Sequence, residues 1–123
     1  METEILRLFK FLESEFDEGE RQEFSVTADQ VVAYVKQHGL PENLYEVPPS
    51  RMDGLHLTEV DGQYVVYSQE RGSQSEGERF STKEEALARL TVMILEHFTW
   101  SGFILLKDNT FDVVDTKPLT QLH

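Results

Sequence analysis

The side chains best suited to acid–base or metal chemistry are four histidines, His38, His56, His97 and His123. No two of them lie three or four residues apart, the spacing that brings two ligands to one helix face in HExxH-type zinc sites. His38 and His97 fall near predicted helix ends, where the helix dipole favours a cation. No neighbour in the sequence supplies the orienting partner that a catalytic histidine needs. We therefore predict structural or surface roles for all four.

An acidic run suggests either a calcium site or a charged surface patch; it contains Glu13, Glu15, Asp17, Glu18, Glu20 and Glu23. An EF-hand loop needs oxygen ligands at alternate positions, a central glycine and a glutamate at the twelfth position. Glu13, Glu15 and Asp17 alternate, and Gly19 is near the centre, but the twelfth position is Phe24. We therefore expect no metal. A solvated helix end is the favoured interpretation, followed by a partner-facing patch that includes Glu15, Asp17 and Glu18.

Motifs that would indicate an enzyme are missing from the sequence. There is no cysteine, which excludes disulfides, thiolate catalysis and cysteine-based zinc sites. No G-x-x-x-x-G-K-[ST], G-x-G-x-x-G or G-x-S-x-G pattern occurs. Among 23 acidic residues some carboxylate pairs are inevitable, so such pairs carry no specificity. We predict no enzymatic activity, no catalytic residues and no cofactor; a catalytic site assembled only by the fold remains a third-ranked hypothesis.

The charge balance narrows the choice of partner. The chain has 23 acidic and 11 basic residues, a net charge of −12. Phosphate and anionic membrane surfaces require clustered Lys and Arg, so neither nucleic acid nor membrane is an expected ligand. Four aromatic residues could in principle stack on RNA bases, but the same negative charge would repel the phosphates. We instead predict core packing for most of them: Tyr64, Tyr67, Phe80 and Trp100. The charge favours a basic protein partner, although acidity also serves solubility.

Length and composition predict one folded domain, residues 1–123. Hydrophobic residues make up 39% and aromatics 11% of the chain, more than a disordered acidic segment carries. The acidic N-terminus differs from a signal peptide, and no apolar stretch approaches the roughly 18 residues of a membrane span. We therefore expect a cytoplasmic protein.

Two helices are predicted in the first third of the chain. Apolar residues recur at helical spacing from Thr3 to Phe16. Thr27 and Gln30 have the spacing of a capping box, which marks the start of the second helix. Gly39 marks the end of this helix. The segment Pro41–Gly54 contains several prolines and is predicted to be a loop.

A hairpin is the clearest local feature. Asp61-Gly62 lies between two strand-like runs, Leu55–Val60 and Gln63–Gln69. Both positions of a type I′ turn need positive φ, which Asp-Gly supplies. The two-residue turn places Val60 opposite Gln63 and Leu57 opposite Val66. The second strand is apolar on both faces, which predicts a central position in the sheet.

A third strand, Glu78–Phe80, precedes a helix predicted from Thr82 to His97. Ser81 and Glu84 have capping-box spacing at its start. A final hairpin is predicted, with strands at Phe103–Leu106 and Thr110–Val114. The fold class is therefore α+β: two N-terminal helices, a three-stranded antiparallel meander, a helix and a C-terminal β-hairpin, with the helices packed on one sheet.

The middle of the chain resembles a known group of proteins. A hairpin with a glycine at its tip contains the strand Tyr64–Tyr67, which continues into Ser68–Gly72. A polar segment follows, and after it come Phe80 and a helix with an acidic start, Lys83–Leu87. Together with Gly39-Leu40-Pro41 and Tyr45, this resembles small immunity proteins encoded beside polymorphic bacterial toxins, including those of contact-dependent growth inhibition. The resemblance covers roughly residues 38–96. It implies a protein without enzymatic activity that binds and neutralises a cognate toxin, often a basic nuclease.

Five residues near the end of the hairpin are candidates for contact with such a partner: Tyr67, Glu70, Arg71, Glu76 and Glu78. The glutamates could meet basic toxin residues, and Tyr67 could lie at an interface edge. Each also has a structural interpretation. Gly72 would supply a positive φ, Arg71 would pair with a nearby acid, and Tyr67 would belong to the core.

The favoured hypothesis is thus an immunity protein that blocks the active site, or an adjacent surface, of a basic toxin domain. The alternative is a cytoplasmic adaptor or regulatory interaction domain without a toxin partner. The sequence sets no oligomeric state.

Overall fold

A computed structural model of the chain describes residues 2–14 and 21–108. Its elements are α1 (Glu2–Glu13), β1 (Gln22–Thr27), α2 (Ala28–His38), the 3-10 turn η1 (Glu42–Leu44), β2 (Gly54–Val60), β3 (Gln63–Glu70), β4 (Ser73–Gln74), β5 (Glu78–Phe80), α3 (Lys83–Trp100) and β6 (Ile104–Asp108). The predicted α+β class is confirmed. No helix within the described ranges is both long and apolar enough to cross a bilayer.

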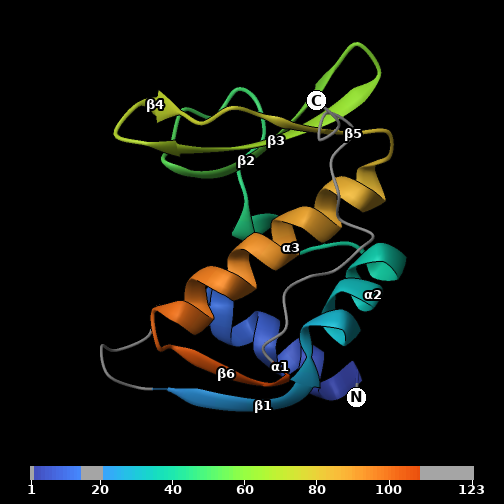
Figure 1. Cartoon of the computed structure of the whole chain (residues 1–123), viewed down its shortest axis with the longest axis vertical. Helices are drawn as coiled ribbons and strands as arrows, with labels where there is room; N and C mark the ends of the chain where they lie inside the picture. The colour runs from blue at the N-terminus through green and yellow to red at the C-terminus, as the bar shows by residue number, and fades with distance from the viewer. Residues whose placement is uncertain (1, 15–20, 109–123) are drawn as a thin grey trace.

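Helix α3 runs through the middle of the molecule, with a sheet near each end (Figure 1). The meander of β2, β3, β4 and β5 lies near its N-terminus, and a two-stranded sheet of β1 and β6 lies near its C-terminus. The prediction of a single sheet is therefore wrong. Strand β1 was not predicted. Its pattern is that of a strand, since buried Phe24 and Val26 alternate with exposed Glu23 and Ser25. The acidic run that precedes it obscures this short alternation in the sequence.

Strand β6 forms at the place of the first strand of the predicted last hairpin. Among the residues that the structure describes it pairs with β1, which lies some 80 residues earlier in the chain. The two strands pair in parallel, with Gln22 opposite Ile104 and Phe24 opposite Leu106. Parallel pairing needs a long connection, so no local turn signal announces it. The other predicted hairpin strand, Thr110–Val114, lies outside the described residues.

The edge of β1 away from β6 is covered by side chains of α1. Gln22 N–H points to β6 and donates to the Phe103 carbonyl, so Glu23 and Ser25 turn their backbone groups the other way. Arg7 Nη2 donates to the Glu23 carbonyl at 2.7 Å, and Ser25 N–H donates to Glu4 Oε2 at 2.8 Å. Arg7 and Glu4 pair at 2.7 Å. The ion pair thus satisfies one edge amide and one edge carbonyl that a neighbouring strand would otherwise bind.

This edge contact predicts a pH dependence. The hydrogen bond from Arg7, followed by that from the Ser25 amide, lowers the pKa of Glu4 from 4.5 to about 2. Ionised Glu4 therefore stabilises the fold fully above about pH 4.5, and this stabilisation is lost as the pH falls toward 2. We expect urea midpoints of Glu4→Gln to fall less than wild type between pH 6 and pH 3. Glu2→Gln, on the same exposed helix end, should keep the wild-type slope; equal slopes in all three proteins would contradict the role of Glu4.

The meander follows the predicted register. Val60 pairs with Gln63 and Leu57 with Val66, across a turn in which Asp61 has φ 53° and Gly62 φ 78°. Strand β3 is central, since it pairs with β2, β4 and β5. The sheet therefore has the predicted three-stranded meander, with the two-residue β4 as an addition.

The helix caps are confirmed for α2 and shifted for α3. Thr27 Oγ1 accepts from Gln30 N–H, and the Gln30 side chain accepts from Thr27 N–H, which is the predicted capping box. The cap of α3 is Thr82, not Ser81: its extended backbone directs Oγ1 to the Glu85 N–H at 3.2 Å. Helix α3 also continues to Trp100, three residues past the predicted end.

One cluster of buried apolar side chains joins α1, α2, α3 and both sheets. Leu8, Val26, Val66, Phe80 and Leu90 are among its members, each at most 2% exposed. Because α3 contributes to the core along its length, it holds the two sheets in a common arrangement.

Candidate functional site

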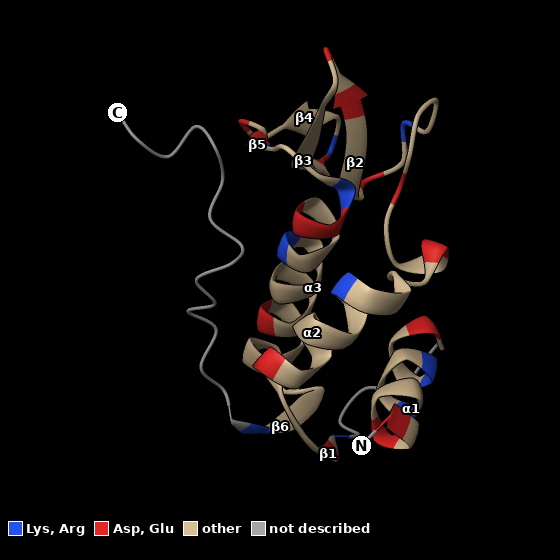
Figure 2. Ribbon diagram, turned by 90° about the vertical axis from the view of Figure 1, so that its right-hand side faces the viewer, with Lys and Arg blue, Asp and Glu red and all other residues tan. Residues whose placement is uncertain are grey.

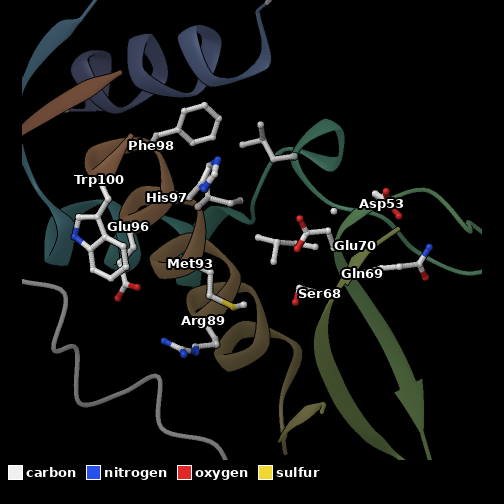
Figure 3. A pocket seen from close by; sticks show the side chains of 14 residues that line it. Asp53, Ser68, Gln69, Glu70, Arg89, Met93, Glu96, His97, Phe98 and Trp100 are labelled. Atoms are coloured by element: carbon white, nitrogen blue, oxygen red, sulfur yellow. The ribbon is translucent and has the colours of Figure 1, made fainter. Parts of the chain in front are cut away.

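A cleft of about 800 Å³ opens between α3 and the end of the meander (Figure 3). One wall is α3, from Arg89 to Trp100. The other wall consists of the last residues of β3, the first residues of β2 and Leu44 of η1. Figure 1 shows that α3 runs obliquely away from the meander strands, so the two walls diverge.

The helix wall is a single stripe of α3. Arg89, Met93, Glu96 and Trp100 are spaced by four, three and four residues, so they lie along one face of the helix. In the close view Met93 and His97 project from this wall, with Trp100 beside Glu96 at its far end (Figure 3).

The sheet wall follows from the alternation of β3. Val66 points into the core against α3, so Ser68 and Glu70 share its face, two and four residues further along. Opposite Ser68, Leu55 is half-buried on the same face of the sheet. The floor between the two walls is apolar, formed mainly by Leu55, Met93 and Ile94.

Trp100 is the chain's only tryptophan and is 76% exposed. Core packing explains Phe80, which is fully buried, and Tyr64, which packs against the core, but it does not explain Trp100. Trp100 is the last residue of α3, where the chain turns through Ser101 and Gly102 toward β6. An exposed tryptophan beside a cleft is typical of a binding anchor.

The cleft carries a negative charge. Glu70 and Glu96 form no hydrogen bond or ion pair with other side chains in the described part of the chain. Arg89, the one arginine in the lining, is bound through Nε and Nη2 to both carboxylate oxygens of Glu78, at 2.7 and 3.1 Å. Figure 2 shows acidic and basic positions interspersed along α3. The two glutamates are thus available to a cationic ligand.

Asp53, at the mouth of the cleft, serves the structure of the sheet wall. Its carboxylate accepts from Arg71 N–H at 3.0 Å and Gly72 N–H at 3.4 Å. These two backbone hydrogen bonds lower the pKa of Asp53, so it is ionised at neutral pH. The loop before β2 is thereby tied to the β3–β4 turn, next to Glu70.

The predicted partner-binding residues are spread over the meander. Glu70 lines the cleft. Arg71 is exposed in a turn where it has φ 53° and Gly72 φ 82°, and its own N–H, rather than its guanidinium, reaches Asp53. Glu76 is exposed in the segment between β4 and β5. Glu78 is committed to Arg89, and half-buried Tyr67 stacks on His56. Glu15, Asp17 and Glu18 lie outside the described residues.

The described histidines occupy three different places. His56 is 1% exposed, donates through Nε2 to the Met52 carbonyl at 2.6 Å and stacks on Tyr67. His38 packs on Tyr34, and His97 lines the cleft. His123 lies outside the described residues. Within residues 2–14 and 21–108, no group of three or more His, Asp or Glu side chains could hold a metal ion.

Sequence reasoning missed Met93, Glu96 and Trp100 as site residues. The sequence prediction ended the helix at His97, and it counted Trp100 among aromatic residues that mostly pack in the core. The sequence could have indicated this site through the helical spacing of Arg89, Glu96 and Trp100. A helix face that packs only against the core would be wholly apolar, whereas this face also carries charged side chains.

Comparison with known proteins finds no matching family model, no similar curated protein and no similar solved structure.

Proposed function

We propose that this protein is an immunity protein that binds a basic bacterial toxin domain and neutralises it by covering its active site or an adjacent surface. The observation that carries the proposal is the acidic cleft. Glu70 and Glu96, which no side chain in the described ranges binds, and exposed Trp100 surround an apolar floor, in a chain of net charge −12. The resemblance of residues 38–96 to immunity proteins supports the same function independently of charge.

Neutralisation by binding needs a rigid, complementary surface more than it needs chemistry. The cleft walls stand on a helix and a sheet that share one core, which suits a preorganised interface. The negative field of the whole chain would speed encounter with a basic toxin.

The test is co-expression with the C-terminal hundred or so residues of the protein encoded immediately upstream. We expect this fragment to arrest growth and the present protein to restore it, with a 1:1 complex in light scattering. The association rate should fall at least about tenfold between low and high salt, because steering is screened. A neighbouring product without toxicity that still binds would favour the adaptor alternative; absence of both toxicity and binding would refute the proposal.

A further inference from the structure

We propose that the cleft between α3 and the meander binds an arginine-containing segment of the partner protein, with a guanidinium stacked on Trp100 and bonded to Glu96. This inference rests on the proposed function and names the surface that performs it. It is carried by the position, exposure and charge of the residues on the two walls.

The helix wall provides a site for a planar cation. Glu96 and Trp100 are four residues apart on α3, so their side chains are neighbours on one face. A guanidinium can lie over an indole and donate two hydrogen bonds to a carboxylate in its own plane. Lysine, a compact point charge, matches this pair less well. The geometry therefore favours arginine.

The sheet wall and the floor accommodate the rest of the segment. The apolar surface of Met93, Leu55 and Ile94 can bury an aliphatic side chain or the methylenes of arginine. Glu70, on the opposite wall, meets a second cationic group. Arg89 does not neutralise these carboxylates, because Glu78 holds both its Nε and its Nη2.

Other occupants fit less well. Nucleic acid or an acidic peptide would face Glu70 and Glu96. A wholly apolar helix would leave both carboxylates desolvated and unpaired, which is costly. A second copy of this chain carries the same net charge of −12 and would be repelled.

The first experiment uses Trp100 as its own reporter, since it is the chain's only tryptophan. The probe is the blocked peptide Arg-Leu-Arg-Leu-Arg, titrated against the full chain while Trp100 emission is recorded. The control peptide replaces each arginine with citrulline, which keeps the shape and removes the charge. We expect a saturable change with the arginine peptide and at least about a tenfold weaker response with citrulline.

Two double variants separate local recognition from the overall field. E70Q/E96Q removes the two carboxylates on which the proposed site depends, and E23Q/E59Q removes two exposed carboxylates outside the cleft lining, so both change the net charge equally. We expect at least about tenfold weaker peptide binding for E70Q/E96Q and less than about twofold for E23Q/E59Q. Equal weakening in both would overturn the site, because it would show that only the net charge matters.

A third comparison uses the toxin fragment. Trp100→Ala should weaken its binding at least about tenfold, and Trp100→Phe should weaken it less, while circular dichroism stays unchanged because Trp100 is exposed. A complex that forms equally well with E70Q/E96Q and Trp100→Ala would refute the cleft and leave the proposed function intact. Peptide binding without any toxin binding would refute the function alone. Sedimentation showing a dimer that occludes Trp100 would identify a second copy as the occupant and overturn the proposal.

Discussion

Phe80→Ala is expected to lower the free energy of unfolding by about 3–5 kcal/mol. Phe80 is fully buried, pairs across the sheet with Tyr64, and ends a strand of only three residues, three positions before α3 begins. Its ring therefore joins the meander to the helix, and the short β5 offers little else to hold that junction. The loss should also disturb the cleft, whose two walls belong to these two elements.

Urea unfolding followed by far-ultraviolet circular dichroism measures this effect. Phe80→Leu keeps most of the apolar volume and should cost about 1–2 kcal/mol, so it remains measurable even where the alanine variant does not fold. A cost below about 1 kcal/mol for Phe80→Ala would mean that the meander and α3 are held together by other contacts.

His56→Ala should cost about 2–4 kcal/mol. His56 is buried on the face of β2 opposite to Leu57, with its ring stacked on Tyr67 at a centroid distance of 4.8 Å. Its Nε2–H also binds the Met52 carbonyl. The substitution leaves a cavity and an unpaired carbonyl, and it releases the loop that Asp53 ties to the β3–β4 turn.

Two control variants separate these contributions. His56→Phe keeps a ring against Tyr67 but cannot donate to the Met52 carbonyl, so it should cost about 1–3 kcal/mol. Tyr67→Phe keeps the stacked ring and should stay within about 0.5 kcal/mol of wild type. Denaturant unfolding gives the stabilities, and limited proteolysis reports the loop, which we expect to be cleaved faster in His56→Ala. A wild-type stability and cleavage rate in His56→Ala would show that the loop is held without the histidine.

The cleft connects these stability effects to the proposed function. Glu70 was proposed as a recognition residue from the sequence, and the structure places it in the cleft lining. Its position depends on Asp53, which holds the adjacent turn through the Arg71 and Gly72 amides. Variants that loosen this turn should therefore weaken partner binding without touching Glu70 itself.

Local structure was predictable wherever the signal was local. The Asp61-Gly62 turn determines the β2–β3 register because both residues adopt positive φ, and the Thr27–Gln30 capping box marks the start of α2. The Thr82 cap was missed by one residue because Ser81 and Thr82 are both good caps, each followed three residues later by a glutamate.

The long-range arrangement was not predictable in the same way. The parallel pairing of β1 with β6, the cover of the β1 edge by Arg7 and Glu4, and the Glu78–Arg89 pair all join segments 11 or more residues apart. No periodicity or turn motif encodes which distant segment will satisfy a strand edge or a charge.

The α+β class, the meander with its register and the net charge of −12 could all be predicted, because each follows from composition or from neighbours along the chain. Tertiary contacts, by contrast, leave Glu70 without a side-chain partner among residues 2–14 and 21–108, bind Glu78 to Arg89, and place Trp100 at a cleft instead of in the core. Solvent exposure and ion pairing depend on which elements meet in space, and here α3 diverges from the meander, so Glu70 lines one wall of the cleft while Glu96 and Trp100 line the other.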